Sequence, residues 1–152
     1  MALLLVTGGA GFIGSCYVLS RCYAGDTVVN LDKLTYSGNL GNFEVLRGNP
    51  KHIFVHGDIG NVELVEHLLK TYQPDAVVNF AAESHVDRSI IDPEAFVRTN
   101  VLGTCTLLRT TKTWWKECAA AHRATFRFLH VSTDEVFGAL HPGDPAFTED
   151  TP

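Results

Sequence analysis

The chain has 152 residues, 45% of them hydrophobic, and a formal net charge of −5. This length is typical of one domain with a real core, and a negative charge without a basic run argues against nucleic acid or an anionic membrane as partner. The sequence has no apolar run of the roughly 18 residues that a membrane span needs and no signal-peptide pattern at its start, which predicts a cytoplasmic protein.

The first predicted elements are a buried strand over Ala2–Thr7, a glycine-rich turn and a helix over Phe12–Ala24. Gly8 allows a tight turn, Gly11 lets the backbone approach a pyrophosphate, and Gly14 lets the helix pack closely on the sheet. The N–H groups at the start of the helix would face the phosphates. This order of strand, glycine triplet and helix predicts a dinucleotide-binding site.

A second predicted strand, Thr27–Leu31, ends at Asp32. A carboxylate at this position accepts hydrogen bonds from the adenosine ribose hydroxyls and repels a 2′-phosphate, which favours NAD over NADP. Lys33 follows directly and leaves the alternative open, because a cation here can serve a 2′-phosphate.

Apolar runs then alternate with longer amphipathic stretches, the pattern of parallel βαβ units. We expect a doubly wound parallel α/β sheet, the Rossmann NAD-binding fold, with strand order 3-2-1-4-5. The remaining predicted strands are Ile53–His56, Ala76–Phe80 and Phe128–Val131, and the remaining helices are Asn39–Arg47 (short), Val62–Thr71 and Ala95–Cys118.

Polar residues follow each predicted strand, and ligands of such sheets bind beyond the carboxyl ends of the strands. Asp58 and Ile59 follow the third strand, and Ala81, Ala82 and Ser84 follow the fourth. These residues should converge with the glycine turn on one edge. Asp58 has an alternative role as N-cap of the helix near Val62.

Adjacent acids, Asp134 and Glu135, come after the fifth predicted strand and follow Thr133. Such a pair in a loop is usually solvated charge, but a strand end that faces a cofactor is where catalytic groups are placed. Two acids in one partly desolvated site push their pKa values apart, so that one holds a proton while the other accepts one.

The four cysteines, Cys16, Cys22, Cys105 and Cys118, include no C-x-x-C pair. We expect small buried apolar residues in a reducing compartment rather than disulfides or metal ligands.

Six segments of the sequence resemble the dTDP-glucose 4,6-dehydratases, a family of extended short-chain dehydrogenases/reductases. They are T-G-G-A-G-F-I-G, L-D-K-L-T-Y-S-G-N-L, H-G-D-I, A-A-E-S-H-V-D-R-S-I, T-N-V-L-G-T and S-T-D-E-V-F-G. The T-D-E run is the specific element, because related sugar-nucleotide epimerases typically lack the Asp-Glu pair. Phe137 stands where the family often has Tyr.

The resemblance implies a lyase that converts dTDP-glucose to its 4-keto-6-deoxy product with NAD as internal redox cofactor. In this family pattern Glu135 removes the C5 proton, Asp134 protonates the departing C6 hydroxyl, and Thr133 hydrogen-bonds the hexose near Ser84. A homodimer is also implied. The positions that match the family's cofactor contacts are Phe12, Ile13, Asp32, Lys33, Leu34, Thr35, Asp58, Ile59, Ala81, Ala82 and Thr99, beside Gly8, Gly11 and Gly14 of the turn.

The family's Tyr-x-x-x-Lys pair, which serves the hydride step, has no match here: none of the four tyrosines is followed four residues later by Lys. We therefore expect an incomplete Rossmann domain over residues 1–152, with the last strands and a C-terminal nucleotide-sugar-binding domain outside this chain. The alternatives are another extended short-chain enzyme, such as an epimerase or decarboxylase, and a non-catalytic NAD-binding fragment.

Overall fold

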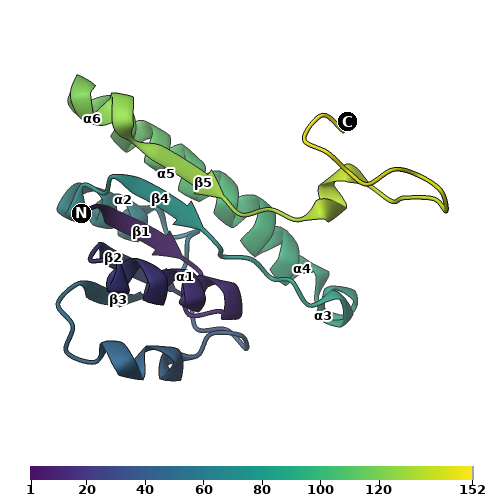
Figure 1. The fold of residues 1–152 in the computed structure, drawn as a ribbon, viewed down its shortest axis with the longest axis horizontal. Helices are drawn as coiled ribbons and strands as arrows, with labels where there is room; N and C mark the ends of the chain where they lie inside the picture. The colour runs from purple at the N-terminus through teal and green to yellow at the C-terminus, as the bar shows by residue number, and fades with distance from the viewer. Residues whose placement is uncertain (152) are drawn as a thin grey trace.

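The computed structural model describes residues 1–151 as a five-stranded parallel sheet with helices on both faces (Figure 1). The strand order is β3-β2-β1-β4-β5, which confirms the predicted order and the Rossmann fold class. The strands are β1 (Leu3–Thr7), β2 (Thr27–Asp32), β3 (His52–His56), β4 (Ala76–Asn79) and β5 (Arg127–His130).

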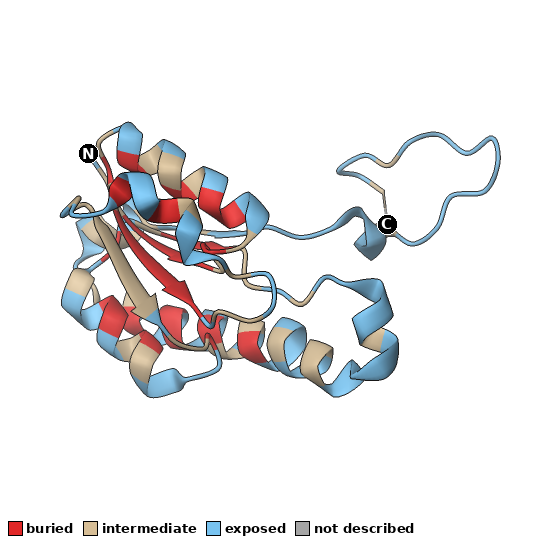
Figure 2. Ribbon diagram, turned by 90° about the horizontal axis from the view of Figure 1, so that it is seen from below, coloured by how far each residue is buried: buried red, intermediate tan, exposed pale blue. Residues whose placement is uncertain are grey.

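Two hydrophobic clusters cover the two faces of the sheet. One joins helix α1 (Phe12–Tyr23) and the 3₁₀ helix η1 (Leu40–Leu46) to the face that carries Val6 and Val28. The other joins α2 (Val62–Tyr72) and α5 (Thr104–Glu117) to the opposite face. Figure 2 shows the buried residues along the central strands and the inner sides of the helices.

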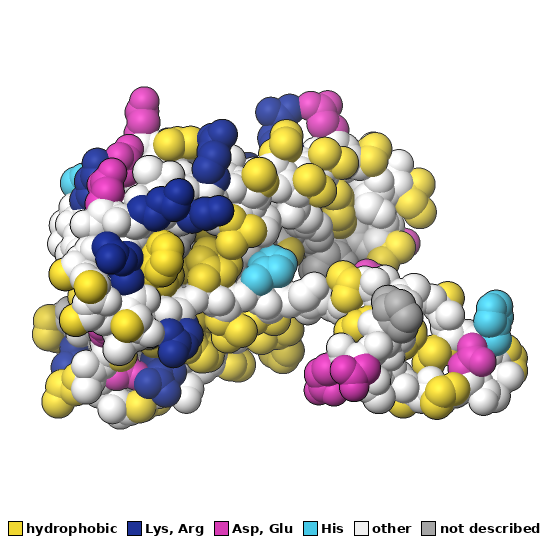
Figure 3. Space-filling model, turned by 90° about the horizontal axis from the view of Figure 1, so that it is seen from above, with side chains coloured by type: hydrophobic (Ala, Val, Ile, Leu, Met, Phe, Trp, Pro, Cys, Tyr) yellow, Lys and Arg dark blue, Asp and Glu magenta, His cyan; other side chains and the backbone are white. Residues whose placement is uncertain are grey.

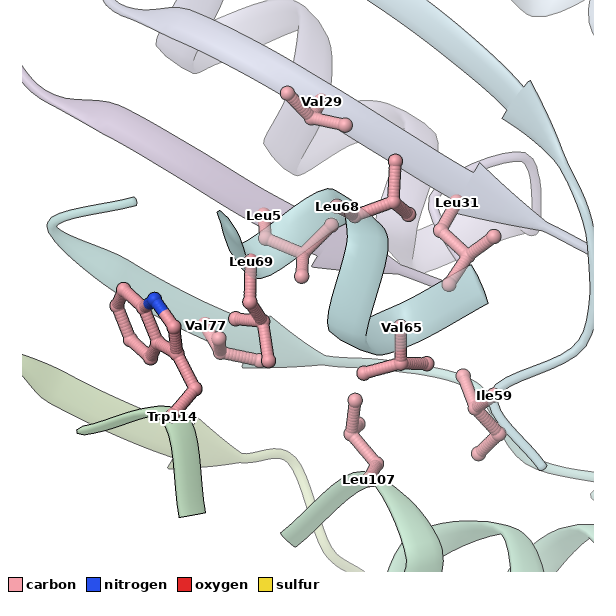
Figure 4. Packing of buried hydrophobic residues seen from close by; sticks show 10 residues of the cluster. All are labelled: Leu5, Val29, Leu31, Ile59, Val65, Leu68, Leu69, Val77, Leu107 and Trp114. Carbon is pink, nitrogen blue, oxygen red and sulfur yellow. The ribbon is translucent and has the colours of Figure 1, made fainter. Parts of the chain in front are cut away.

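Figure 4 shows how the second cluster is built from side chains that are far apart in the sequence. Leu5 and Val77 from neighbouring strands lie beneath Leu69 of α2 and Leu107 of α5, and all four are at most 1% exposed. Strands buried on both faces read as continuous apolar runs, which is why their positions were visible in the sequence.

The predicted helix Ala95–Cys118 is wrong as a single α-helix. The structure has a short helix, α4 (Pro93–Phe96), a π-helical stretch, η2 (Val97–Gly103), and then α5. Pro93 follows an N-cap, Asp92, whose side chain accepts from the Ala95 N–H. Apolar spacing alone does not reveal such a change of helical pitch.

Helices α3 (Val86–Ile91) and α6 (Ala120–Thr125), and the 3₁₀ turn η3 (Asp134–Phe137), were not predicted. All three are short and contain no buried residue, so they lack the apolar periodicity that identifies a helix.

All four cysteines are free thiols, but the expectation that all are buried is wrong. Cys16 and Cys105 are exposed, because they lie on the outward faces of α1 and α5, while Cys22 is buried. In residues 1–151 no helix is long and apolar enough to cross a membrane.

Candidate functional site at the carboxyl edge of the sheet

The glycine turn between β1 and α1 fits tightly against the start of the loop after β4. Gly8 has φ +69°, and a Cβ there would lie 2.4 Å from the Ala81 backbone nitrogen. A Cβ at Gly14 would lie 2.3 Å from the Gly8 carbonyl oxygen, so Gly14 packs on the turn itself rather than on the sheet. A Cβ at Gly11 would meet only the Gly8 oxygen, at 3.5 Å. The protein therefore has room for a side chain at Gly11, and a glycine there leaves the backbone accessible from outside.

This difference predicts that alanine substitutions at Gly8 and Gly11 lower the free energy of unfolding by different amounts. Gly8→Ala combines a left-handed φ with a backbone clash, and we expect it to lower the free energy of unfolding by more than about 3 kcal/mol. Gly11→Ala should lower it by less than about 1 kcal/mol, the scale of a helix N-cap change, while still weakening dinucleotide binding. Chemical denaturation and cofactor titration of both variants measure these effects. Equal stabilities would contradict the steric argument.

Asp32 holds the turn and the next loop together. It is 8% exposed, its Oδ2 accepts from the Ala10 N–H at 2.8 Å, and its Oδ1 accepts from the Leu34 N–H at 2.7 Å. Leu34 adopts φ +54°, a conformation that this hydrogen bond helps to stabilise. Each carboxylate oxygen keeps a lone pair for another donor. Asp32 thus has a structural role that the sequence did not indicate, beside the expected ribose contact.

Lys33 points to the end of β3. Its Nζ lies 2.7 Å from Asp58 Oδ2, which neutralises the cation locally. Partial burial raises the pKa of Asp58, but the hydrogen bonds from Lys33 and Gly60 and the charges of Lys33 and Arg98 together outweigh it and lower this pKa below its usual value. The alternative role of Asp58 as helix N-cap is wrong: Asn61 caps α2 by accepting from the Leu64 N–H.

A polar ladder crosses three strand ends beside this turn. Thr7 of β1 donates to Asn79 Oδ1, and Asn79 Nδ2 lies 3.0 Å from His130 Nδ1 of β5. Asn79 Oδ1 also accepts from the Ala81 N–H at 3.1 Å. Asn79 is fully buried, so these bonds fix both its amide and the start of the loop after β4. An asparagine within the apolar run of β4 was a signal for this role in the sequence, and we did not predict it.

Asn100, in the π-helical stretch η2, clamps the same loop further along. Its Oδ1 accepts from the Glu83 N–H and its Nδ2 donates to the Glu83 carbonyl, both at 2.8 Å. The neighbouring Thr99 is half-buried, and Ser84 is exposed directly after the clamp. The clamp therefore joins the chain neighbours of two predicted site residues, the cofactor residue Thr99 and the substrate residue Ser84.

The predicted cofactor residues differ in accessibility. Phe12 and Ile13, at the start of α1, are 85% and 63% exposed, a costly placement for large apolar side chains without a ligand. Thr35 and Ala81 are half-buried, and Ala82 is exposed. Ile59 is 4% exposed and packs in the core, so its side chain is not available to a ligand.

The acid pair lies on an arm that leaves the sheet after β5 (Figures 1 and 2). Thr133 caps η3: its hydroxyl donates to Asp134 Oδ1 at 3.3 Å and accepts from the Glu135 N–H at 3.4 Å. The expected partial desolvation is wrong for this chain, because Asp134 and Glu135 are both exposed and η3 contains no buried residue. Figure 3 shows acidic side chains of this arm standing apart from the body.

Comparison with known proteins places this geometry in a family. The family described as GDP-mannose 4,6 dehydratase matches residues 5–152. The chain belongs to this family.

Two members and one more distant relative illustrate the similarity. A dTDP-glucose 4,6-dehydratase of Xanthomonas campestris is 59% identical over the whole chain, which spans 43% of that relative's length, and this confirms the expected resemblance. The dTDP-glucose 4,6-dehydratase DesIV of Streptomyces venezuelae, solved with NAD and TYD bound, is 45% identical with a TM-score of 0.81, and the match covers 99% of this chain and 44% of DesIV. A UDP-glucose 4-epimerase of Thermus thermophilus in complex with NAD is 29% identical with a TM-score of 0.79, over 99% of this chain and 43% of the epimerase.

Proposed function

We propose that this chain supplies the NAD site and the acid–base pair of an enzyme that dehydrates dTDP-glucose to the 4-keto-6-deoxy sugar. The observation that carries the proposal is the Thr133-Asp134-Glu135 run, which follows β5 at the same edge of the sheet as the glycine turn. Two similar proteins are dTDP-glucose 4,6-dehydratases, which supports the substrate class. Incubating the full gene product with dTDP-glucose and following the 4-keto-6-deoxy product tests it.

The residues fit NAD because Gly11 leaves the backbone open, Phe12 and Ile13 expose apolar surface, and Asp32 retains free acceptor positions. NAD held by these residues would supply the reversible redox chemistry of the reaction, oxidation at C4 of the sugar and reduction at C6. The resulting 4-keto group acidifies the C5 proton, which Glu135 takes. Asp134 protonates the C6 hydroxyl, since hydroxide is a poor leaving group without an acid.

NAD rather than NADP follows from the charges at the end of β2. Asp32 is a buried carboxylate there, and the neighbouring cation Lys33 is paired with Asp58. The Asp32 carboxylate would repel a 2′-phosphate, and Lys33, already paired with Asp58, would not offset this repulsion. We therefore assign the adenosine ribose to the Asp32 side of the turn.

Asp32→Ala tests this assignment. We expect NAD affinity to fall by about 1–3 kcal/mol and the preference for NAD over NADP to shrink, because hydrogen bonds to the ribose and repulsion of the 2′-phosphate are both lost. The matched control is Asp26→Ala, which removes another buried carboxylate that accepts a backbone N–H, just before the opposite end of β2. Titration of both cofactors should show an unchanged preference in the control. The same result for Asp32→Ala would remove it from the ribose site.

A homodimer is part of the proposal. Large apolar side chains of α3 and η2 are more than half exposed, among them Ile90, Ile91, Val101 and Leu102. Figure 3 shows hydrophobic side chains gathered on this part of the surface. A second copy of the chain is the occupant that we assign to it, and sedimentation of the full gene product measures the mass.

A further inference from the structure

Tyr36 and Arg88 join two loops that the sheet keeps apart. The Arg88 guanidinium carbon lies 3.9 Å from the centre of the Tyr36 ring, the geometry of a cation–π contact. The His85 ring meets the same tyrosine edge-on, with centroids 6.1 Å apart. Tyr36 belongs to the loop after β2, whereas His85 and Arg88 belong to the loop after β4 and to helix α3.

Strands β2 and β4 are not neighbours, because β1 lies between them. Their ends are therefore about 10 Å apart, two strand spacings, and a contact between their loops spans the end of β1. The glycine turn Gly8–Gly11 occupies that end. On the proposed NAD site, the ribose lies on the β2 side and the pyrophosphate over the turn, so the contact bridges the place where the dinucleotide passes.

The contact is too exposed to matter much for folding. Tyr36 is 41% exposed and Arg88 is exposed. Among residues 1–151 Arg88 takes part in no ion pair, so its charge is not neutralised by a carboxylate of the described chain. A cation in this position suits a ligand that carries two phosphate charges.

We propose that Tyr36 and Arg88 form a strap across the dinucleotide site and determine how slowly the cofactor leaves. This inference rests on the proposed NAD site. Tyr36 and Arg88 are positioning residues: the ring and the guanidinium hold the loops after β2 and β4 together over the cofactor. An internal redox cofactor, which is oxidised and reduced within one turnover, must remain bound throughout, and slow release serves that requirement.

The test is the release of NADH from the full gene product, followed by the loss of NADH fluorescence when excess NAD is added. We expect Tyr36→Leu and Arg88→Gln each to raise the dissociation rate constant about three- to tenfold. Tyr36→Phe, which keeps the ring, should release NADH at the wild-type rate. The double variant Tyr36→Leu/Arg88→Gln should be no faster than the faster single variant, because the contact that the two residues share is lost only once.

Tyr23→Leu is the matched control, since Tyr23 is a 69% exposed aromatic residue at the far end of α1. Its NADH release should equal that of the wild type, and all variants should melt at the wild-type temperature. Two outcomes would overturn the strap while leaving the NAD site in place, provided that the wild type binds NADH. In the first, both single variants release NADH at the wild-type rate. In the second, the effects of the two substitutions add in the double variant. If the wild type binds no NADH, the NAD site itself is overturned. Should Tyr36→Leu fail to fold, Arg88→Gln and Tyr36→Phe still decide.

Discussion

We expect the 152-residue chain alone to give no steady turnover of dTDP-glucose, whatever its affinity for NAD. None of its four tyrosines is followed four residues later by Lys, so the family's base for the C4 hydroxyl has no counterpart in it. Loss of general-base help costs about 10²–10⁴-fold in rate, and loss of substrate positioning adds to this. The exposed acid pair on the arm after β5 supports the same expectation, because both side chains lie in solvent rather than in an enclosed sugar site.

An assay of the purified chain with NAD and dTDP-glucose, read out as 4-keto product, measures this. The Xanthomonas campestris dTDP-glucose 4,6-dehydratase, of which this chain spans 43%, is the positive control. Turnover by the 152-residue chain at the control's rate would mean that a residue within it replaces the tyrosine, and the expectation would be wrong.

In the full gene product, we expect Glu135→Gln to block elimination far more severely than oxidation at C4. The amide has nearly the same shape as the acid but cannot take the C5 proton, and we expect a loss of about 10²–10⁴-fold in product formation. Solvent deuterium exchange at C5 should cease, while NADH absorbance still develops with dTDP-glucose. Normal exchange in the variant would show that another group is the base.

Asp134→Asn is the matched comparison, because it makes the same chemical change one residue earlier. It spares the base and removes the acid, so exchange at C5 should continue while loss of water slows. The pair of variants therefore separates the two roles within one T-D-E run. Loss of exchange in both variants to the same extent would contradict the assignment of distinct roles.

The sheet and the glycine turn were accessible from sequence because their signals are local. Apolar runs identify strands buried on both faces, and Gly8 must be glycine for a steric reason that operates over a few residues. The roles of Asn79 and Asn100 were not accessible in the same way. Asn79 meets Thr7 from 72 residues away, and Asn100 meets Glu83 from 17 residues away, so their partners exist only in the folded chain.

For the acid pair, the sequence predicts the position in the fold but not the surroundings. Its position after β5 follows from the strand pattern, but its surroundings depend on which surfaces pack against the arm. The prediction of one long α-helix was wrong for a similar reason. A Cβ at Gly103, inside the π-helical stretch, would lie 3.0 Å from Ile59, and the spacing of apolar residues encodes neither this neighbour nor the helical pitch.

The ladder across the strand ends determines where His130 carries its proton. The Ala81 N–H can only donate, so the atom of Asn79 that receives it is the oxygen, and the amide nitrogen faces His130. His130 Nδ1 must then be the acceptor, which makes the neutral imidazole the Nε2–H tautomer. The last residue of β5 therefore offers an N–H donor on its other ring nitrogen, three residues before Thr133.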